Sequence, residues 1–327
     1  MGKKAKKSKS LQKVKNNIIF YAARATMFIA KSIPLNIGLK IGAAIGGAAW
    51  HLLPYERNCA MVHLKLAFPE KSDKELLAIG KESLRSLGRG FFEIFHFDDI
   101  FATLGRADSY IEVIGIEHFE NAVKNEGTGA MAFTGHIGNW ELMVATVSKC
   151  GFKCNTVVRN LYDPRLDKLL NDHRLKNGYV PMTRGGDELV ADIANVFAKN
   201  ELLGLLIDQD TRVRSVFANF FGVPAKTPSG VAYLALMAQK DIHPCFNYRR
   251  PDGKFVVHIH PPLIRPQSGD MKADIQKYTE MMNESLCDHI RLHPDQWVWM
   301  HRRWKTRPEG EPKDKHPAPR PRKPYKY

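Results

Sequence analysis

Short apolar runs alternate with longer helical stretches through most of the chain, and this alternation is the strongest constraint on its fold. The apolar runs are 110–114, 129–134, 155–158, 202–207, 242–248 and 255–259. The helical stretches are 116–124, 139–149, 164–176, 187–199, 229–238 and 271–292. Strands that alternate with helices predict an α/β fold with a mixed, largely parallel sheet flanked by helices. The segment Pro251-Asp252-Gly253 predicts a hairpin turn between the last two strands.

Residues 18–53 are the most apolar part of the chain, but charged residues interrupt them. Their longest uncharged run, Ile41–Leu53, is shorter than the roughly 18 residues that a spanning helix requires. Asn17, Arg24 and Lys31 recur every seven residues, so a helix would carry them as one narrow polar stripe beside a wide apolar face. Such a helix suits the membrane interface or a tilted span. A buried helical hairpin in a soluble core is the alternative.

A second expected helix follows Pro34 and carries glycines four residues apart, at positions 38, 42 and 46. Small residues at this spacing form a ridge that lets another helix approach closely. We therefore expect membrane-associating helices at 18–53, after a basic tail at 1–17. The main globular domain is expected at 54–307. The basic, proline-rich residues 308–327 are expected to form a disordered tail.

The formal charge of +15 lies almost entirely at the two ends of the chain. Residues 1–15 hold seven lysines and no acidic residue, and residues 301–327 hold ten basic and three acidic residues, which leaves +1 for residues 16–300. A near-neutral body argues against a nucleic-acid-binding protein. A basic segment next to an apolar helix favours contact with an anionic membrane surface on the cytoplasmic side.

The five cysteines show neither a disulfide framework nor a metal site. Their number is odd and their spacing irregular, which predicts reduced thiols in a cytoplasm-facing protein. Cys150 and Cys154 are close in sequence, but no second Cys or His pair follows at zinc-finger spacing. We therefore expect no metal and no cofactor.

One segment, residues 133–141, carries the chemistry: Phe-Thr-Gly-His-Ile-Gly-Asn-Trp-Glu. It places His136 after an expected strand, at the edge where open α/β sheets bind ligands. Glu141 lies in the first turn of the next helix and is expected to hold one imidazole nitrogen, so that His136 acts as a general base. No Ser or Cys lies beside His136, so we expect a substrate hydroxyl to attack a bound acyl group directly. A capped helix with a purely structural His is the alternative.

Six motifs in order make the sequence resemble the lauroyl/myristoyl acyltransferases of lipid A biosynthesis, in the glycerolipid acyltransferase superfamily. His136 and Glu141 match that family's His-x4-Glu block. The first motif, Arg57 to Glu70, departs from the family pattern at His63, where Asn is usual. The other motifs are Val158–Asn160 with Arg174 downstream, Asp208–Asp210, Phe220–Thr227 and Gln296–Lys305.

The resemblance implies a glycerol-3-phosphate acyltransferase-like fold in a membrane-associated enzyme at the cytoplasmic face of the bacterial inner membrane. It implies acyl carrier protein as the acyl donor. The implied acceptor is a hydroxyl of a lipid A precursor, a phosphorylated and acylated glucosamine disaccharide. An enzyme of the same superfamily that acts on another glycolipid or a lysophospholipid, with acyl-CoA as donor, is the alternative. A non-catalytic membrane-binding scaffold is the alternative from another class.

Further residues are expected to contact the substrates. Arg159 and Arg174 offer planar forks for a phosphate or the pantetheine arm, with surface ion pairs as the alternative. Gly135 and Gly138 are expected to let the backbone approach the thioester, with N–H groups as oxyanion donors. The remaining expected substrate-binding residues are Asn139, Asp208 and Asp210.

Two groups of aromatic residues allow two interpretations each. Trp297, Trp299, Arg302 and Arg303 suit an aromatic and basic edge at the membrane interface, or half-buried strand positions. Phe217, Phe220 and Phe221 suit the wall of an acyl-chain groove, or ordinary core packing.

Overall fold

A computed structural model describes residues 2–125, 127–185 and 188–311 of the chain. The side chains of residues 2–11, 13 and 125 are outside this description. The predicted tail at 308–327 lies outside the described residues from residue 312 onward.

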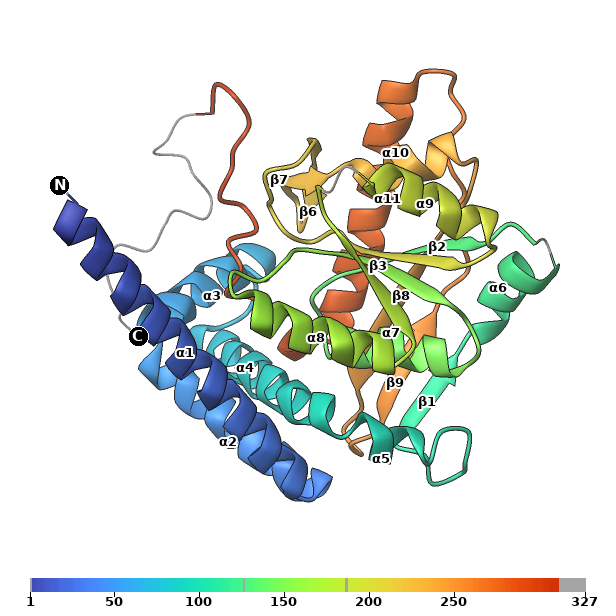
Figure 1. The fold of residues 1–327 in the computed structure, drawn as a ribbon. Helices are drawn as coiled ribbons and strands as arrows, with labels where there is room; N and C mark the ends of the chain where they lie inside the picture. Colours follow the sequence, from blue (N-terminus) through green and yellow to red (C-terminus); the bar gives the residue numbers. More distant parts are fainter. Residues whose placement is uncertain (1, 126, 186–187, 312–327) are drawn as a thin grey trace.

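A seven-stranded sheet forms the centre of the molecule, with the strand order β1-β9-β8-β2-β5-β3-β4 (Figure 1). Its strands are β1 (Ile111–Ile114), β2 (Ala130–Thr134), β3 (Cys154–Val158), β4 (Tyr179–Thr183), β5 (Leu202–Leu206), β8 (Ile242–Arg249) and β9 (Phe255–Ile259). All neighbouring strands are parallel except the β8–β9 hairpin. The predicted α/β class, the largely parallel sheet and the turn at 251–253 are therefore confirmed.

Helices cover both faces of the sheet. The α-helices of the described residues are α1 (Gly2–Ser32), α2 (Leu35–Leu52), α3 (Pro54–Ala67), α4 (Asp73–Phe95), α5 (Phe97–Phe101), α6 (Ile116–Glu120), α7 (Trp140–Lys149), α8 (Pro164–Lys176), α9 (Leu189–Ala198), α10 (Gly230–Met237) and α11 (Met271–Leu292). Alternate residues of β2 face two separate apolar cores. Ala132 packs with residues of α7, whereas Phe133 packs with residues of α10 and α11.

Three strands were not expected from the sequence. Edge strand β4 contains Pro181, which lacks an N–H group and is tolerated only at sheet edges or strand ends. The other two are β6 (Ser215–Phe220) and β7 (Val223–Pro228), which form a separate antiparallel hairpin. This hairpin includes the Phe220–Thr227 motif, whose prolines and glycine obscure the alternation typical of strands.

The glycine ridge predicted in the second helix is confirmed, and its partner is α4. A Cβ atom added to Gly42 would lie 2.2 Å from the carbonyl oxygen of Gly88, and one added to Gly88 would lie 2.0 Å from that of Gly42. A Cβ at Gly46 would meet the carbonyl of Leu84 at 2.1 Å. The two backbones are in contact along this ridge, so only glycine fits at these positions.

The Lys-rich segment expected as a tail forms the first half of α1. No proline or glycine interrupts residues 3–32, and lysine and alanine favour helix. Figure 1 shows α1, α2 and α4 side by side as an arm beside the sheet domain.

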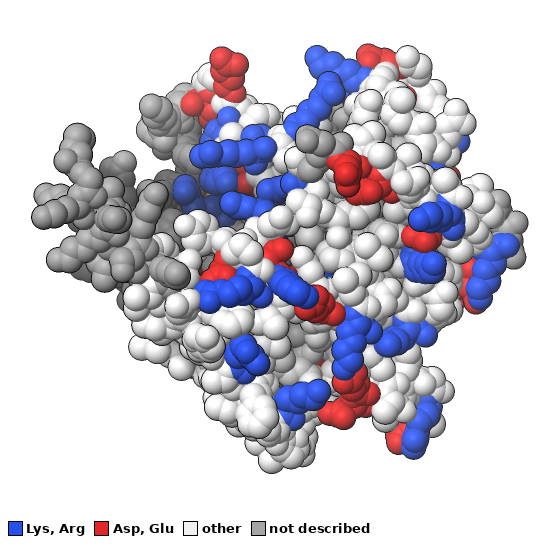
Figure 2. All heavy atoms as spheres, in the orientation of Figure 1, with Lys and Arg blue, Asp and Glu red and all other residues white. Residues whose placement is uncertain are grey.

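The outer side of this arm is apolar and exposed. The exposed large apolar residues described on α1 are Val14, Ile18, Ile19, Tyr21, Phe28 and Ile29, and those on α2 are Ile37, Ile45 and Leu52. In Figure 2 this part of the surface is largely uncharged, whereas Lys and Arg gather around the β6–β7 hairpin. Among the residues that the structure describes, no helix is long and apolar enough to cross a membrane.

Candidate active site

His136 is the second residue after β2. Asp208, which follows the end of β5, holds it in place. The Nδ1 atom of His136 lies 2.7 Å from Oδ1 of Asp208, and the backbone N–H of His136 donates to Oδ2 over 2.7 Å. Because β2 and β5 are parallel neighbours, their carboxyl ends lie side by side. With Nδ1–H donating to the carboxylate, Nε2 carries the lone pair of the neutral imidazole. The imidazole is therefore oriented as a base.

Asp208 is fully buried, and its carboxylate accepts a third hydrogen bond, from Nε1 of Trp297 over 2.8 Å. Burial by itself would raise the pKa of Asp208, but the charge of His136 and the three hydrogen bonds hold it well below the usual range. Asp208 was expected to bind substrate. It instead stays ionised beneath His136, and its oxygens are occupied by protein donors.

The expectation that Glu141 holds the imidazole of His136 is wrong. Its carboxylate accepts hydrogen bonds from Nη2 of Arg174 at 2.5 Å, from Nε of Arg174 at 3.1 Å and from the hydroxyl of Tyr179. Burial would lower the pKa of Arg174, but its bonds to Glu141 raise it. The fork of Arg174 grips a carboxylate in this structure, which matches the ion-pair alternative for this residue, except that the pair is mostly buried. The cluster ties α7 to α8 and β4.

The N–H groups of Ile137 and Gly138, in the His136 turn, are already bonded to backbone carbonyls. The N–H of Gly138 donates to the carbonyl of Gln296 over 2.9 Å, and that of Ile137 donates to the carbonyl of Gly135. Gly138 has φ of +57°, and a Cβ there would lie 2.0 Å from Oδ1 of Asn247. A Cβ at Gly135 would sit 3.1 Å from Asp208 Oδ2. Gly138 is thus required by its backbone conformation and by close packing, whereas a side chain at Gly135 would press on Leu286 and Asp208. The N–H of Gly138 does not take the expected role of an oxyanion donor.

Asn139 and Asp210 were expected to bind substrate but serve the fold. Asn139 caps α7 by accepting from the N–H of Leu142, and its amide donates to the buried carboxylate of Glu93 over 2.9 Å. Asp210 accepts from the N–H of Thr306 over 2.9 Å and so fixes the segment after Trp304 to the end of β5. Both side chains are buried.

Two residues at the site were missed as functional candidates, Gln209 and His301. The amide nitrogen of Gln209 lies 3.1 Å from Nε2 of His136 and 3.0 Å from Nδ1 of His301. Burial, followed by the charge of His136, lowers the pKa of His301, which favours the neutral ring that can accept this bond. The signal was present in the sequence, because Gln209 lies inside the Asp208–Asp210 motif and His301 inside the Gln296–Lys305 motif.

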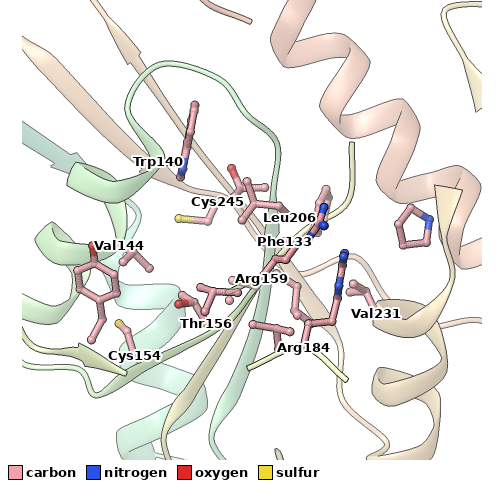
Figure 3. Close-up of a pocket in the computed structure, with 18 of the residues that line it drawn as sticks. Phe133, Trp140, Val144, Cys154, Thr156, Arg159, Arg184, Leu206, Val231 and Cys245 are labelled. Carbon is pink, nitrogen blue, oxygen red and sulfur yellow. The ribbon is translucent and has the colours of Figure 1, made fainter. Parts of the chain in front are cut away.

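A cavity of about 490 Å³ opens beside His136. Its wall includes Arg159, Arg184 and Arg214, which are exposed and form no ion pair with any residue that the structure describes. The rest of the wall is mostly apolar and comes from β2, β3, β5, α7, α9 and α10. In Figure 3, Arg159 and Arg184 lie near the centre of the view, between Cys154 and Val231.

The two aromatic groups take the interior positions. Trp297, Trp299 and Arg303 are at most 1 % exposed, so they form no interfacial edge. Arg303 donates to the carbonyl of Lys226 and the hydroxyl of Thr227, and burial lowers its pKa to about 10. Phe220 and Phe221 pack in the core and do not line the cavity.

The geometry combines an oriented imidazole, an amide donor beside its free nitrogen, an apolar cavity and unpaired arginines. Such a set suits attack by a hydroxyl on the carbonyl of a long-chain acyl group. Among the described residues, no cluster of three or more His, Cys, Asp or Glu could hold a metal ion.

Comparison with known proteins points to the same chemistry. The family model of the bacterial lipid A biosynthesis acyltransferases matches residues 4–306. The chain is 28% identical over 295 residues to a lipid A biosynthesis lauroyltransferase of Escherichia coli, covering 88% of this chain and 91% of that protein. It is 25% identical over 288 residues to a lipid A biosynthesis palmitoleoyltransferase of the same organism, covering 85% and 88%.

A third relative, a phosphatidylinositol mannoside acyltransferase of Mycolicibacterium smegmatis, is 25% identical over 226 residues, covering 68% of this chain and 71% of that protein. The range matched by the family model includes the whole sheet domain and every residue of the candidate site. The chain therefore belongs to the bacterial lipid A biosynthesis acyltransferase family, whose members are enzymes that transfer acyl groups.

Proposed function

We propose that the protein transfers a fatty acyl group from an acyl carrier protein thioester to a hydroxyl of a lipid A precursor. The observation that carries this proposal is the His136–Asp208 pair at the mouth of an apolar cavity. The pair supplies an oriented base, and the cavity supplies a place for an acyl chain. Family membership adds the class of reaction.

In the proposed reaction His136 acts first as a base and then as an acid. Nε2 takes the proton from the acceptor hydroxyl while its oxygen attacks the thioester carbonyl carbon. The carbon–sulfur bond breaks, and the departing sulfur receives the proton from Nε2. An ester and a free thiol result. Asp208 holds the ring and stabilises the imidazolium. The amide of Gln209 contacts Nε2 of the resting imidazole, and it is proposed to turn to the developing oxyanion once the hydroxyl occupies Nε2.

Arg159, Arg184 and Arg214 are proposed to receive phosphate groups. The acceptor and the phosphopantetheine arm of the carrier both carry phosphate, and guanidinium groups bind it bidentately. Arg159 keeps the role expected from the sequence, whereas Arg184 and Arg214 take the place of Arg174. The concentration of Lys and Arg on this face also suits an acidic carrier protein.

The proposed site of action is the cytoplasmic face of the bacterial inner membrane. The exposed apolar side of α1 and α2 has the character of a surface that lies in the membrane interface. The lysines at the start of α1 would then contact anionic headgroups, each contributing about 1 kcal/mol near the surface.

Deletion of residues 2–15 is expected to weaken binding to vesicles that contain anionic lipid, because it removes seven lysines but keeps the apolar residues of α1. Turnover on detergent-dispersed substrate should change little. Vesicle flotation and a transfer assay on the same preparation measure the two effects. Unchanged flotation combined with lost turnover would show that the lysines serve the chemistry rather than the membrane.

The acceptor is tested by mass spectrometry of membrane lipids from cells with and without the gene. We expect lipid A to lose one acyl chain when the gene is absent. A transfer assay with purified enzyme, acyl carrier protein donors and acyl-CoA donors then identifies the donor. The mannoside acyltransferase relatives favour another glycolipid as the second candidate acceptor. An unchanged lipid A acyl count with a change in another glycolipid would select it.

A further inference from the structure

The central sheet splits open between β3 and β5. These strands pair only from Cys154–Leu202 to Thr156–Gly204. On their outer sides, β2 stays paired with β5 as far as Leu206, and β4 stays paired with β3 as far as Val158. The carboxyl-terminal halves of β3 and β5 are therefore only half-buried, although they lie inside a seven-stranded sheet.

The cavity enters this split and reaches both faces of the sheet. On the α7 face it is lined by Ala132, Thr134, Cys154, Thr156, Leu202, Gly204, Met143, Val144 and Val147, and also by the hydrogen-bonded cluster of Glu141, Arg174 and Tyr179. On the opposite face it is lined by Phe133, Val157, Leu205, Ile193, Val231 and Leu234. Figure 3 shows Val144 and Cys154 on one side and Val231 on the other. We call these two parts the α7 lobe and the α10 lobe.

The α7 lobe is the deeper one. It follows β3 from Arg159 at the mouth back to Cys154 at the start of the strand, whereas the α10 lobe reaches only Val157 on that strand. Five residues of strand span about 17 Å. One leaflet of a membrane's hydrocarbon core is about 15 Å thick, half of the bilayer core. The α7 lobe thus has the depth of one extended acyl chain of ordinary membrane length.

The inner end of the α7 lobe is closed and mostly apolar, and Tyr179, the partner of Cys154 on β4, is the polar side chain beside it. Phe119, Val147, Cys154, Leu202 and Cys245 form it, and each is less than a tenth exposed. Burial raises the pKa of the Cys245 thiol to about 12, so this cysteine remains a neutral, inert part of the wall. A blind apolar lobe suits a single unbranched chain that ends in a methyl group.

Gly204 lies halfway along this lobe, opposite Ala132 on β2 and Thr156 on β3. A Cβ atom at Gly204 would meet nothing closer than 3.8 Å, and its φ is not in the left-handed region. The backbone therefore does not require glycine here. Because Gly204 has no side chain, the lobe is wider at this point than it would be with any other residue.

We propose that the α7 lobe holds the acyl chain of the donor and that Gly204 determines how long that chain can be. The proposal rests on the proposed function and adds the residue that sets its donor specificity. The donor chain, rather than the acceptor, is assigned to this lobe because the acceptor carries several chains and a sugar, which a narrow blind lobe cannot admit. The acceptor then approaches from the open mouth with the arginines.

The test replaces Gly204 by Leu in the full-length enzyme. Rates of transfer are measured with a series of acyl carrier protein donors from octanoyl to palmitoyl. The wild-type enzyme is expected to prefer the longer donors. Gly204→Leu is expected to lose about tenfold or more in kcat/KM for them and to retain activity on octanoyl and decanoyl donors, since hydrophobic pockets discriminate by about this factor per misplaced methylene.

Val231→Leu is the matched control, because it adds bulk to the α10 lobe on the other face of the sheet. It is expected to leave the donor-length profile unchanged. Ala132→Val, across from Gly204, obstructs the same lobe. If Gly204→Leu fails to fold, Ala132→Val is expected to show the shift to shorter donors in its place. The assignment of the lobe would be overturned if Gly204→Leu lost the same factor in kcat/KM for every donor length. It would also be overturned if Val231→Leu were the variant whose donor-length profile shifted.

Binding of free fatty acids, followed by native mass spectrometry, separates this inference from the proposed function. If the wild type transfers no acyl group to any acceptor but binds long fatty acids that Gly204→Leu rejects, the lobe assignment stands and the proposed function fails. If the wild type transfers acyl groups, and if Gly204→Leu has the same donor-length profile as the wild type, the lobe assignment fails and the proposed function stands.

Discussion

Replacement of His136 by Ala is expected to reduce acyl transfer by about 10³-fold, within the 10²–10⁴ range of a positioned general base. The side chain of His136 is 17% exposed and borders the cavity, so its removal enlarges an existing space rather than creating a sealed one. The thermal unfolding temperature should therefore change little. A transfer assay and a melting curve on the same preparation measure both quantities.

His301→Ala is the control for this prediction. His301 is also an imidazole that contacts Gln209, and its ring centre lies 5.3 Å from that of His136, but Asp208 does not hold it. Its loss should cost much less activity. A non-catalytic membrane scaffold would tolerate His136→Ala completely, so full activity in that variant would remove the catalytic assignment.

Asp208→Asn is expected to lower kcat by about 10³–10⁴-fold with a smaller effect on KM, as the same change does to an Asp that orients a catalytic His. An amide can present its NH₂ group to Nδ1 and so favour the wrong tautomer. Folding should be checked by circular dichroism, because three donors lose a charged acceptor. The measurement is kcat per folded enzyme.

Glu141→Gln is the matched variant, since it makes the same acid-to-amide change in a carboxylate that lines the same cavity. It leaves the buried guanidinium of Arg174 without its counter-charge, and breaking a buried pair costs about 3–5 kcal/mol. Its main effect should appear in the unfolding temperature. If Glu141→Gln lowers kcat per folded enzyme more than Asp208→Asn does, the orienting role belongs to Glu141.

The depressed pKa of Asp208 also sets the pH range in which its carboxylate stabilises the fold. Because the folded pKa lies below the unfolded value of about 3.9, the stabilisation is fully present above that value. It disappears only as the pH falls towards the folded pKa. The carboxylate that holds His136 is therefore ionised at every pH at which the enzyme would act.

Local sequence patterns correctly predicted the features that depend on neighbouring residues. The alternation of apolar runs and helices depends on each segment's own periodicity, and it predicted the central strands and the place of His136 at the end of β2. The glycine spacing predicted the close contact of α2 with another helix. The strand β4 was missed because Pro181 interrupts its pattern, which only an edge position tolerates.

The partner of His136 could not be predicted in this way. Glu141 is five residues away along the chain, and Asp208 is 72 residues away. The choice between them is made by the pairing of β2 with β5, which places the two strand ends side by side. The same limit applies to Arg174, because its partner Glu141 depends on the packing of α8 against α7 and β4.

The sequence by itself determined the α/β class, the family and the segment that holds the proposed base, because motifs and periodicity are properties of contiguous residues. Only the tertiary structure decided which carboxylate holds His136, which glycines are needed for packing, and where the cavity lies. Each of these depends on residues that are distant along the chain and adjacent in space. The split between β3 and β5 is the clearest case, since both strands have ordinary sequences and the opening lies in their pairing.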